Sequence, residues 1–108
     1  MRGIQRSILK EAIRTFGESN QITVAIEEMS ELTKELCKVK RMFAEGEKYL
    51  SKETLNALSE EMADVLIMLE QLKFIFSNMV EVECFADKKI NRLLSRIQQR
   101  KLKGGGEK

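Results

Sequence analysis

Apolar residues recur at alternating spacings of three and four along the middle of the chain. Before residue 44 this stripe consists of Ile22, Ala25, Met29, Leu32, Leu36, Val39 and Phe43. After residue 52 a second stripe consists of Leu55, Leu58, Met62, Val65, Leu69, Leu72, Phe76 and Met79. The spacing matches the 3.6-residue period of an α-helix and fits a β-strand in neither stretch. The pattern therefore predicts two long amphipathic helices, of about residues 20–44 and 52–78.

Shorter stretches of the same kind predict one helix at each end of the chain. Residues 2–16 place their apolar side chains on one side, and Gly17 is expected to end that helix. A fourth helix is expected from near Glu83 to Leu102. A chain of 108 residues has room for one modest core. We therefore expect an all-α, four-helix bundle over residues 1–102, followed by a disordered tail at residues 103–108.

The connection between the two central helices sets how they should pack. Ser19 or Asn20 can cap the first of them, and Ser51 can cap the second. Because the connection near residues 45–51 is short, the two helices should lie antiparallel.

The second central helix is apolar on nearly every side. Ala63, Ile67 and Phe74 project almost opposite its main stripe. A helix of this kind is not expected at the surface of a small monomer, so the pattern predicts a homodimer or homotetramer built partly through it. The alternative is that the helix lies at the centre of one subunit, covered by the first and fourth helices.

Composition excludes several kinds of chemistry. The chain has no histidine, which excludes His-based triads, His-ligated zinc and di-iron sites that need Glu-x-x-His pairs. Cys37 and Cys84 lie far apart and form no CxxC motif. The first residues contain no apolar run long enough for a signal peptide, and nothing suggests a membrane span. We expect a cytoplasmic protein with reduced thiols and no membrane partner.

Two pairs of acidic residues stand at helical spacing on the central helices. Glu28 and Glu31 share a face of one helix, and Glu61 and Asp64 share a face of the next. Antiparallel pairing about the short connection would bring all four carboxylates to one place beside the core. Four such charges repel one another unless a cation lies between them, and oxygen ligands alone suit Mg²⁺ or Mn²⁺. The alternative for either pair alone is an ordinary solvated helix face.

The last helix carries most of the positive charge. Residues 88–108 contain eight basic residues and one acidic residue, a formal charge of +7, whereas the rest of the chain has −5. Lys89, Arg92 and Arg96 follow one another at spacings of three and four, so they can present three cations to a bound anion. The alternative is a solvated basic face whose cations suit the negative end of the helix dipole.

The acidic segments resemble a known family. Their sequences are Glu27-Glu28-Met29-Ser30-Glu31-Leu32 and Glu60-Glu61-Met62-Ala63-Asp64-Val65. These segments resemble the ExxE…ExxD signature of the MazG-like all-α nucleoside triphosphate pyrophosphohydrolases, in particular the short single-domain members of bacteria and their phages.

The resemblance implies a reaction and assigns residues to it. The reaction is Mg²⁺-dependent hydrolysis of a nucleoside triphosphate to the monophosphate and pyrophosphate, with a role in nucleotide-pool maintenance. Glu28, Glu31, Glu61 and Asp64 would be the metal ligands, with Mn²⁺ as a substitute for Mg²⁺. Glu28 or Glu31 would also accept the proton of the attacking water. Lys89, Arg92 and Arg96 would bind the triphosphate. By analogy, Gln21 and Phe16 would line the pocket for base and sugar.

A non-enzymatic function remains as the alternative. The protein could be a helical oligomeric adaptor, or a nucleic-acid-binding module that uses its basic C-terminal helix. Tyr49 and five phenylalanines are the only aromatic residues, and most of the phenylalanines stand at core spacing. Few are therefore left to stack on bases, and nucleic acid is not expected as the partner.

Overall fold

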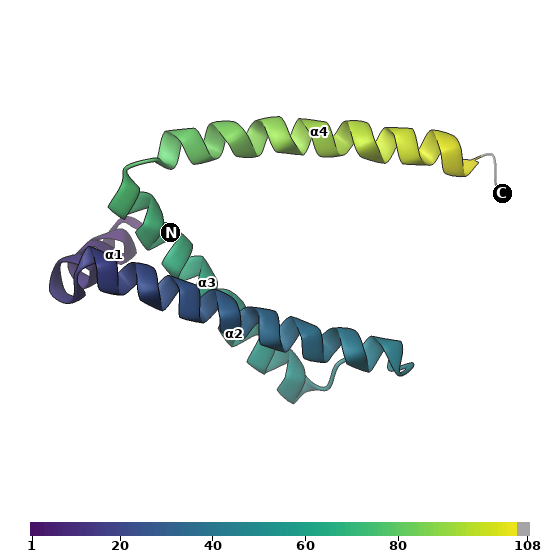
Figure 1. Cartoon of the computed structure of the whole chain (residues 1–108), viewed down its shortest axis with the longest axis horizontal. Coiled ribbons are helices and arrows are strands. Elements are labelled where there is room, and N and C mark those ends of the chain that lie inside the picture. The colour runs from purple at the N-terminus through teal and green to yellow at the C-terminus, as the bar shows by residue number, and fades with distance from the viewer. Residues whose placement is uncertain (106–108) are drawn as a thin grey trace. The chain divides into compact units, whose positions relative to one another are not determined.

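The chain folds into four α-helices, seen in a computed structural model that describes residues 1–105 (Figure 1). They are α1 (Gly3–Phe16), α2 (Glu18–Ala44), α3 (Lys52–Phe76) and α4 (Met79–Gly105). The described residues include no β-strand. The prediction of an all-α protein with four helices is therefore confirmed.

The helix ends agree with the sequence at some positions and differ at others. Ser51 caps α3 as predicted, because its Oγ accepts a hydrogen bond from the backbone N–H of Thr54 at 3.1 Å. Neither Ser19 nor Asn20 caps α2, which already begins at Glu18. The turn between α1 and α2 is instead made by Gly17 alone, at φ +92°. This value lies in a region that glycine adopts without steric cost.

The fourth helix is longer than the sequence predicts. It begins at Met79 rather than near Glu83, and it continues to Gly105. Residues 103–105, which were expected in the disordered tail, are therefore helical. The rest of the expected tail, residues 106–108, lies outside the described residues.

By its contacts the chain divides into two units, Met1–Phe76 and Ser77–Lys108. The first unit contains α1, α2 and α3. Its most extensive contact is between α2 and α3, and α1 touches both of them. The second unit contains the single helix α4. The assignment of residues 1–102 to one domain stays a prediction.

The core of the first unit is small and partly polar. Its buried apolar residues are Leu9, Ala25, Val39 and Met68, and the buried polar residues are Gln21 and Gln71. The main apolar stripe of α3 does not form this core, because Met62 and Leu69 in that stripe remain about half exposed. The side of α3 that meets α2 is instead the side of Met68 and Gln71. Glu61 and Asp64 lie on that side as well, since they precede Met68 and Gln71 at helical spacing.

None of the helices in residues 1–105 combines the length and the apolar character that a membrane crossing needs.

Candidate metal centre

Carboxylates of α2 and α3 converge where the two helices meet. One oxygen each of Glu28, Glu61 and Asp64 lies within 4.8 Å of the other two. Glu28 and Glu61 are half-buried, and Asp64 is exposed. The pairing of residues explains the convergence. Gln21 of α2 contacts Gln71 of α3, so Glu28, two turns further along α2, comes level with residues that precede Gln71 in α3.

The fourth predicted ligand, Glu31, is not part of this group of three. It lies one turn beyond Glu28 and is exposed. Its charge nevertheless acts on the group, because it contributes to raising the pKa of both Glu28 and Glu61. Glu31 therefore lies close enough for its charge to act on Glu28 and Glu61, but its carboxylate is not one of the three that converge.

The cluster disfavours its own ionisation. Partial burial is the largest cause that raises the pKa of Glu28, followed by the charge of Asp64 and a hydrogen bond between the two carboxyl groups. Partial burial is also the largest cause for Glu61, whose pKa is raised further by Asp64 and Glu31. A cation between these groups would remove the repulsion and favour the ionised form.

Two carboxylate oxygens at this place are buried and unpaired. Glu61 Oε2 and Glu35 Oε2 have no hydrogen-bond partner among the described residues. Burying a carboxylate oxygen without a partner is costly, and a bound ion or water would offset that cost. Glu35 Oε1 lies 3.5 Å from Lys38 Nζ, so only one of its oxygens has a counter-charge.

Glu35 is the residue that the sequence analysis left out. A signal for it existed, because Glu28, Glu31 and Glu35 follow one another at spacings of three and four on one face of α2. The charge of Glu35 also contributes to the raised pKa of Glu61. The acidic side of α2 is therefore one turn longer than the predicted pair.

The donor set determines which ions fit. Glu28, Glu61 and Asp64 offer oxygen only, with neither nitrogen nor sulfur ligands in the group. Hard divalent cations such as Mg²⁺ and Mn²⁺ prefer such ligands, and Mg²⁺ commonly uses a few carboxylates and completes its shell with waters and phosphate oxygens. The residues present therefore fit the predicted metal.

The residue expected to contact the base is engaged inside the fold. Gln21 Nε2 donates a hydrogen bond to Gln71 Oε1 at 2.8 Å, and both side chains are buried. Asn20 Nδ2 donates a weaker bond to Gln21 Oε1 at 3.4 Å. Phe16, the other expected pocket residue, is the last residue of α1 and is 61% exposed. Its ring is therefore accessible, whereas the Gln21 amide is not.

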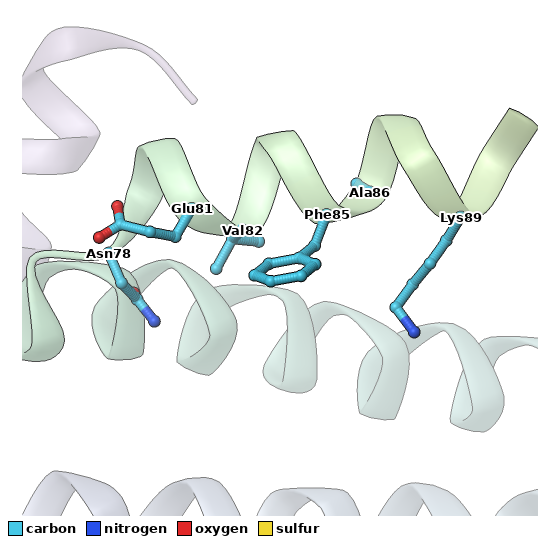
Figure 2. Close-up of a pocket in the computed structure, with 6 residues that line it drawn as sticks. All are labelled: Asn78, Glu81, Val82, Phe85, Ala86 and Lys89. Atoms are coloured by element: carbon cyan, nitrogen blue, oxygen red, sulfur yellow. The ribbon is translucent and has the colours of Figure 1, made fainter.

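The predicted phosphate-binding residues Lys89, Arg92 and Arg96 all lie on α4 and are exposed. Their spacing keeps them on one face of the helix. Figure 2 shows Val82, Phe85 and Lys89 pointing to the same side of α4, around a shallow apolar depression. Lys89 therefore borders an apolar depression of the same helix.

Comparisons with known proteins add no relative: no protein-family model matches the chain, and no curated protein or solved structure matches it either. What can be said of the centre rests on its residues and their geometry.

Proposed function

We propose that the protein is a Mg²⁺-dependent nucleoside triphosphate pyrophosphohydrolase that releases a nucleoside monophosphate and pyrophosphate. The observation that carries this proposal is the approach of Glu28, Glu61 and Asp64 to within 4.8 Å, together with the buried, unpaired Oε2 of Glu61. Without a cation, such an arrangement is destabilising, because a buried carboxylate oxygen has no partner and like charges lie close together. The same oxygens can serve as ligands of a divalent cation. The proposal includes antiparallel central helices and assembly of the chain into a dimer or tetramer.

Each acidic residue has a role in this scheme. Glu28, Glu61 and Asp64 hold the cation, and Glu31 approaches as a fourth carboxylate. Mg²⁺ held by these carboxylates would neutralise phosphate charge and activate water for the reaction. In the overall reaction water adds to the α-phosphorus, the bond from this phosphorus to the bridging oxygen of the β-phosphate breaks, and pyrophosphate leaves. Glu28 or Glu31 accepts the proton of the water.

The remaining predicted residues bind the substrate. Lys89, Arg92 and Arg96 hold the triphosphate through charge-assisted hydrogen bonds. Phe16 offers an exposed ring on which a base can stack. Gln21 contributes to the base and sugar pocket by fixing the adjacent turn of α2 through its bond to Gln71.

The test is pyrophosphate release from a panel of ribo- and deoxyribonucleoside triphosphates, with Mg²⁺, with Mn²⁺ and with a chelator. Glu61→Gln should abolish turnover with its helical circular dichroism intact. Glu60→Gln is the matched control, because it removes the same charge one residue away from the cluster. Arg92→Ala should lower kcat/KM for the triphosphate.

Two results would contradict the proposal. One is full activity of Glu61→Gln, which would remove the metal assignment. The other is that no nucleotide of the panel releases pyrophosphate and that neither metal raises the melting temperature of the protein. The protein would then be better described as a non-enzymatic helical adaptor or a nucleic-acid-binding module, since such a protein is indifferent to the cation.

A further inference from the structure

A buried amide pair and the acidic cluster lie at the same spacing on both of the helices that carry them. On α2, Glu28 follows Gln21 by seven residues. On α3, Asp64 precedes Gln71 by seven residues. Seven residues make nearly two helical turns, about 10 Å along the axis, so the two members of each set lie on one side of their helix. The amide bond and the approach of the carboxylates therefore belong to one alignment of α2 with α3.

Apart from Gln21 and Gln71, the buried side chains that the structure describes on α2 and α3 are apolar. They are Ala25 and Val39 on α2 and Met68 on α3. Ala25 and Met68 are 1% and 4% exposed, and each stands between the glutamine and the carboxylate of its own helix. The hydrophobic effect is non-directional and methionine adapts its shape, so these contacts tolerate a small slide of one helix along the other.

The bond between the two glutamines does not tolerate such a slide. Gln21 Nε2 and Gln71 Oε1 are 2.8 Å apart, and a hydrogen bond weakens steeply as its distance and angle depart from the preferred values. The other contacts of the two amides are weak, at 3.4 Å to Asn20 and at 3.5 Å to the Met68 sulfur. A displaced pair would leave both amides buried without a strong partner, which is costly. The amide pair is therefore the buried contact that selects one alignment of the two helices.

The acidic cluster depends on that alignment, because its carboxylates come from both helices. Glu28 belongs to α2, whereas Glu61 and Asp64 belong to α3, so a slide moves the first carboxylate away from the other two. Each residue advances a helix by about 1.5 Å. Mg²⁺ takes its oxygen ligands at about 2.1 Å in nearly ideal octahedral geometry, whereas Ca²⁺ accepts longer and more variable distances. A slide smaller than one residue is therefore enough to weaken an Mg²⁺ site.

We propose that Gln21 and Gln71 are positioning residues of the metal centre: their buried bond holds α2 and α3 in the alignment that brings Glu28 to Glu61 and Asp64. Neither glutamine contacts the ion in this scheme. A single buried polar residue fixes the register of paired helices in coiled coils in a comparable way. The inference rests on the proposed function, because it takes the acidic cluster as a cation site.

A role in positioning differs from a role in stability alone. Gln21→Leu together with Gln71→Leu removes the bond, leaves no amide unpaired and keeps a similar volume, so the double variant should be nearly as stable as the wild type. It keeps the apolar contact between the helices but has no directional contact to fix their alignment. If the pair acts through stability alone, metal affinity recovers together with stability. If the pair positions the carboxylates, stability recovers and metal affinity does not.

The test is isothermal titration calorimetry of the full chain with Mg²⁺, Mn²⁺ and Ca²⁺, without nucleotide. In the double variant the dissociation constant of Mg²⁺ should rise at least about tenfold, as is usual when groups that orient metal ligands are lost. The dissociation constant of Ca²⁺ should rise less, because Ca²⁺ accepts a more variable geometry. Val39→Ala is the matched control, since Val39 is a residue of α2 that is 8% exposed and its side chain forms no directional bond. It should lower the melting temperature but leave the dissociation constants of both ions unchanged.

Circular dichroism checks that each variant folds. If the double variant loses helicity, Gln21→Met together with Gln71→Met decides instead, because methionine is unbranched like glutamine and adapts to its surroundings. Wild-type affinity for Mg²⁺ in a folded double variant, or an equal loss of affinity in Val39→Ala, would overturn the inference and leave the proposed metal centre intact. So would a loss of helicity in both double variants, because the pair would then be needed for the fold itself. A wild type that binds neither Mg²⁺ nor Mn²⁺ would overturn the proposed metal centre as well.

Discussion

The hydrogen bond between Gln21 and Gln71 allows a double-mutant test in which two destabilising substitutions should largely cancel. The two side chains are 6% and 3% exposed, and their amides are joined at 2.8 Å across the α2–α3 contact. Replacing either glutamine by leucine keeps a similar volume but removes one partner of the bond. The amide left behind is buried in a mostly apolar place with only weak contacts, to Asn20 at 3.4 Å or to the Met68 sulfur at 3.5 Å.

The magnitude follows from the burial of both groups. A buried polar group that loses its partner costs about 1–3 kcal/mol, so we expect Gln21→Leu and Gln71→Leu each to cost about 2 kcal/mol. The double variant leaves no orphaned amide and adds an apolar contact, so its cost should fall below about 1 kcal/mol. At about 4 °C per kcal/mol for a chain of this size, each single variant should melt about 8 °C lower and the double variant close to the wild type.

The assay is urea and thermal unfolding followed by circular dichroism, at one protein concentration because dissociation would otherwise shift the melting temperature. Two singles that are each costly, with a double that is nearly neutral, would show that the bond acts as a unit. If the two costs simply add, the two amides do not depend on each other and the reasoning is refuted. Pyrophosphate release by the stable double variant would also show whether Gln21 is needed for the substrate.

Three further outcomes are expected. Without metal, stability should fall as pH rises above the ordinary glutamate pKa of 4.5, because the raised pKa of Glu28 and that of Glu61 make the folded state bind more protons than the unfolded state. Glu61→Gln should flatten this fall in thermal melts with a chelator, and an unchanged profile would contradict the pKa shift. Gly17→Ala should cost about 1 kcal/mol in urea unfolding through backbone strain alone. At Gly17 φ is +92° and an added Cβ would meet no described atom within 4 Å, so a stabilised variant would count against this reasoning. Ser51→Ala should cost about 1 kcal/mol by the same assay through loss of the α3 cap, and Ser51→Asp should restore it if capping is the cause.

The acidic cluster shows how far local spacing can predict a site. Glu28 and Glu31 on one helix, with Glu61 and Asp64 on the next, are visible as pairs in the sequence, and the short connection between the helices predicts that they meet. Three of the four do so. The buried, unpaired oxygens of Glu61 and Glu35 could not be predicted, because the burial of one oxygen depends on how two helices cross and which side chains surround it.

The sequence alone determined that this chain is helical, where its four helices lie to within a few residues, and which positions on each are apolar. These properties follow from the backbone period and from capping residues, which act over one or two turns. Only the tertiary structure decided which apolar face is buried. On α3 the side of Met68 and Gln71 lies against α2, while the more regular stripe through Met62 and Leu69 stays half-exposed. The physical reason is that the hydrophobic effect is non-directional: it favours covering every apolar face, but it does not specify which surface covers it.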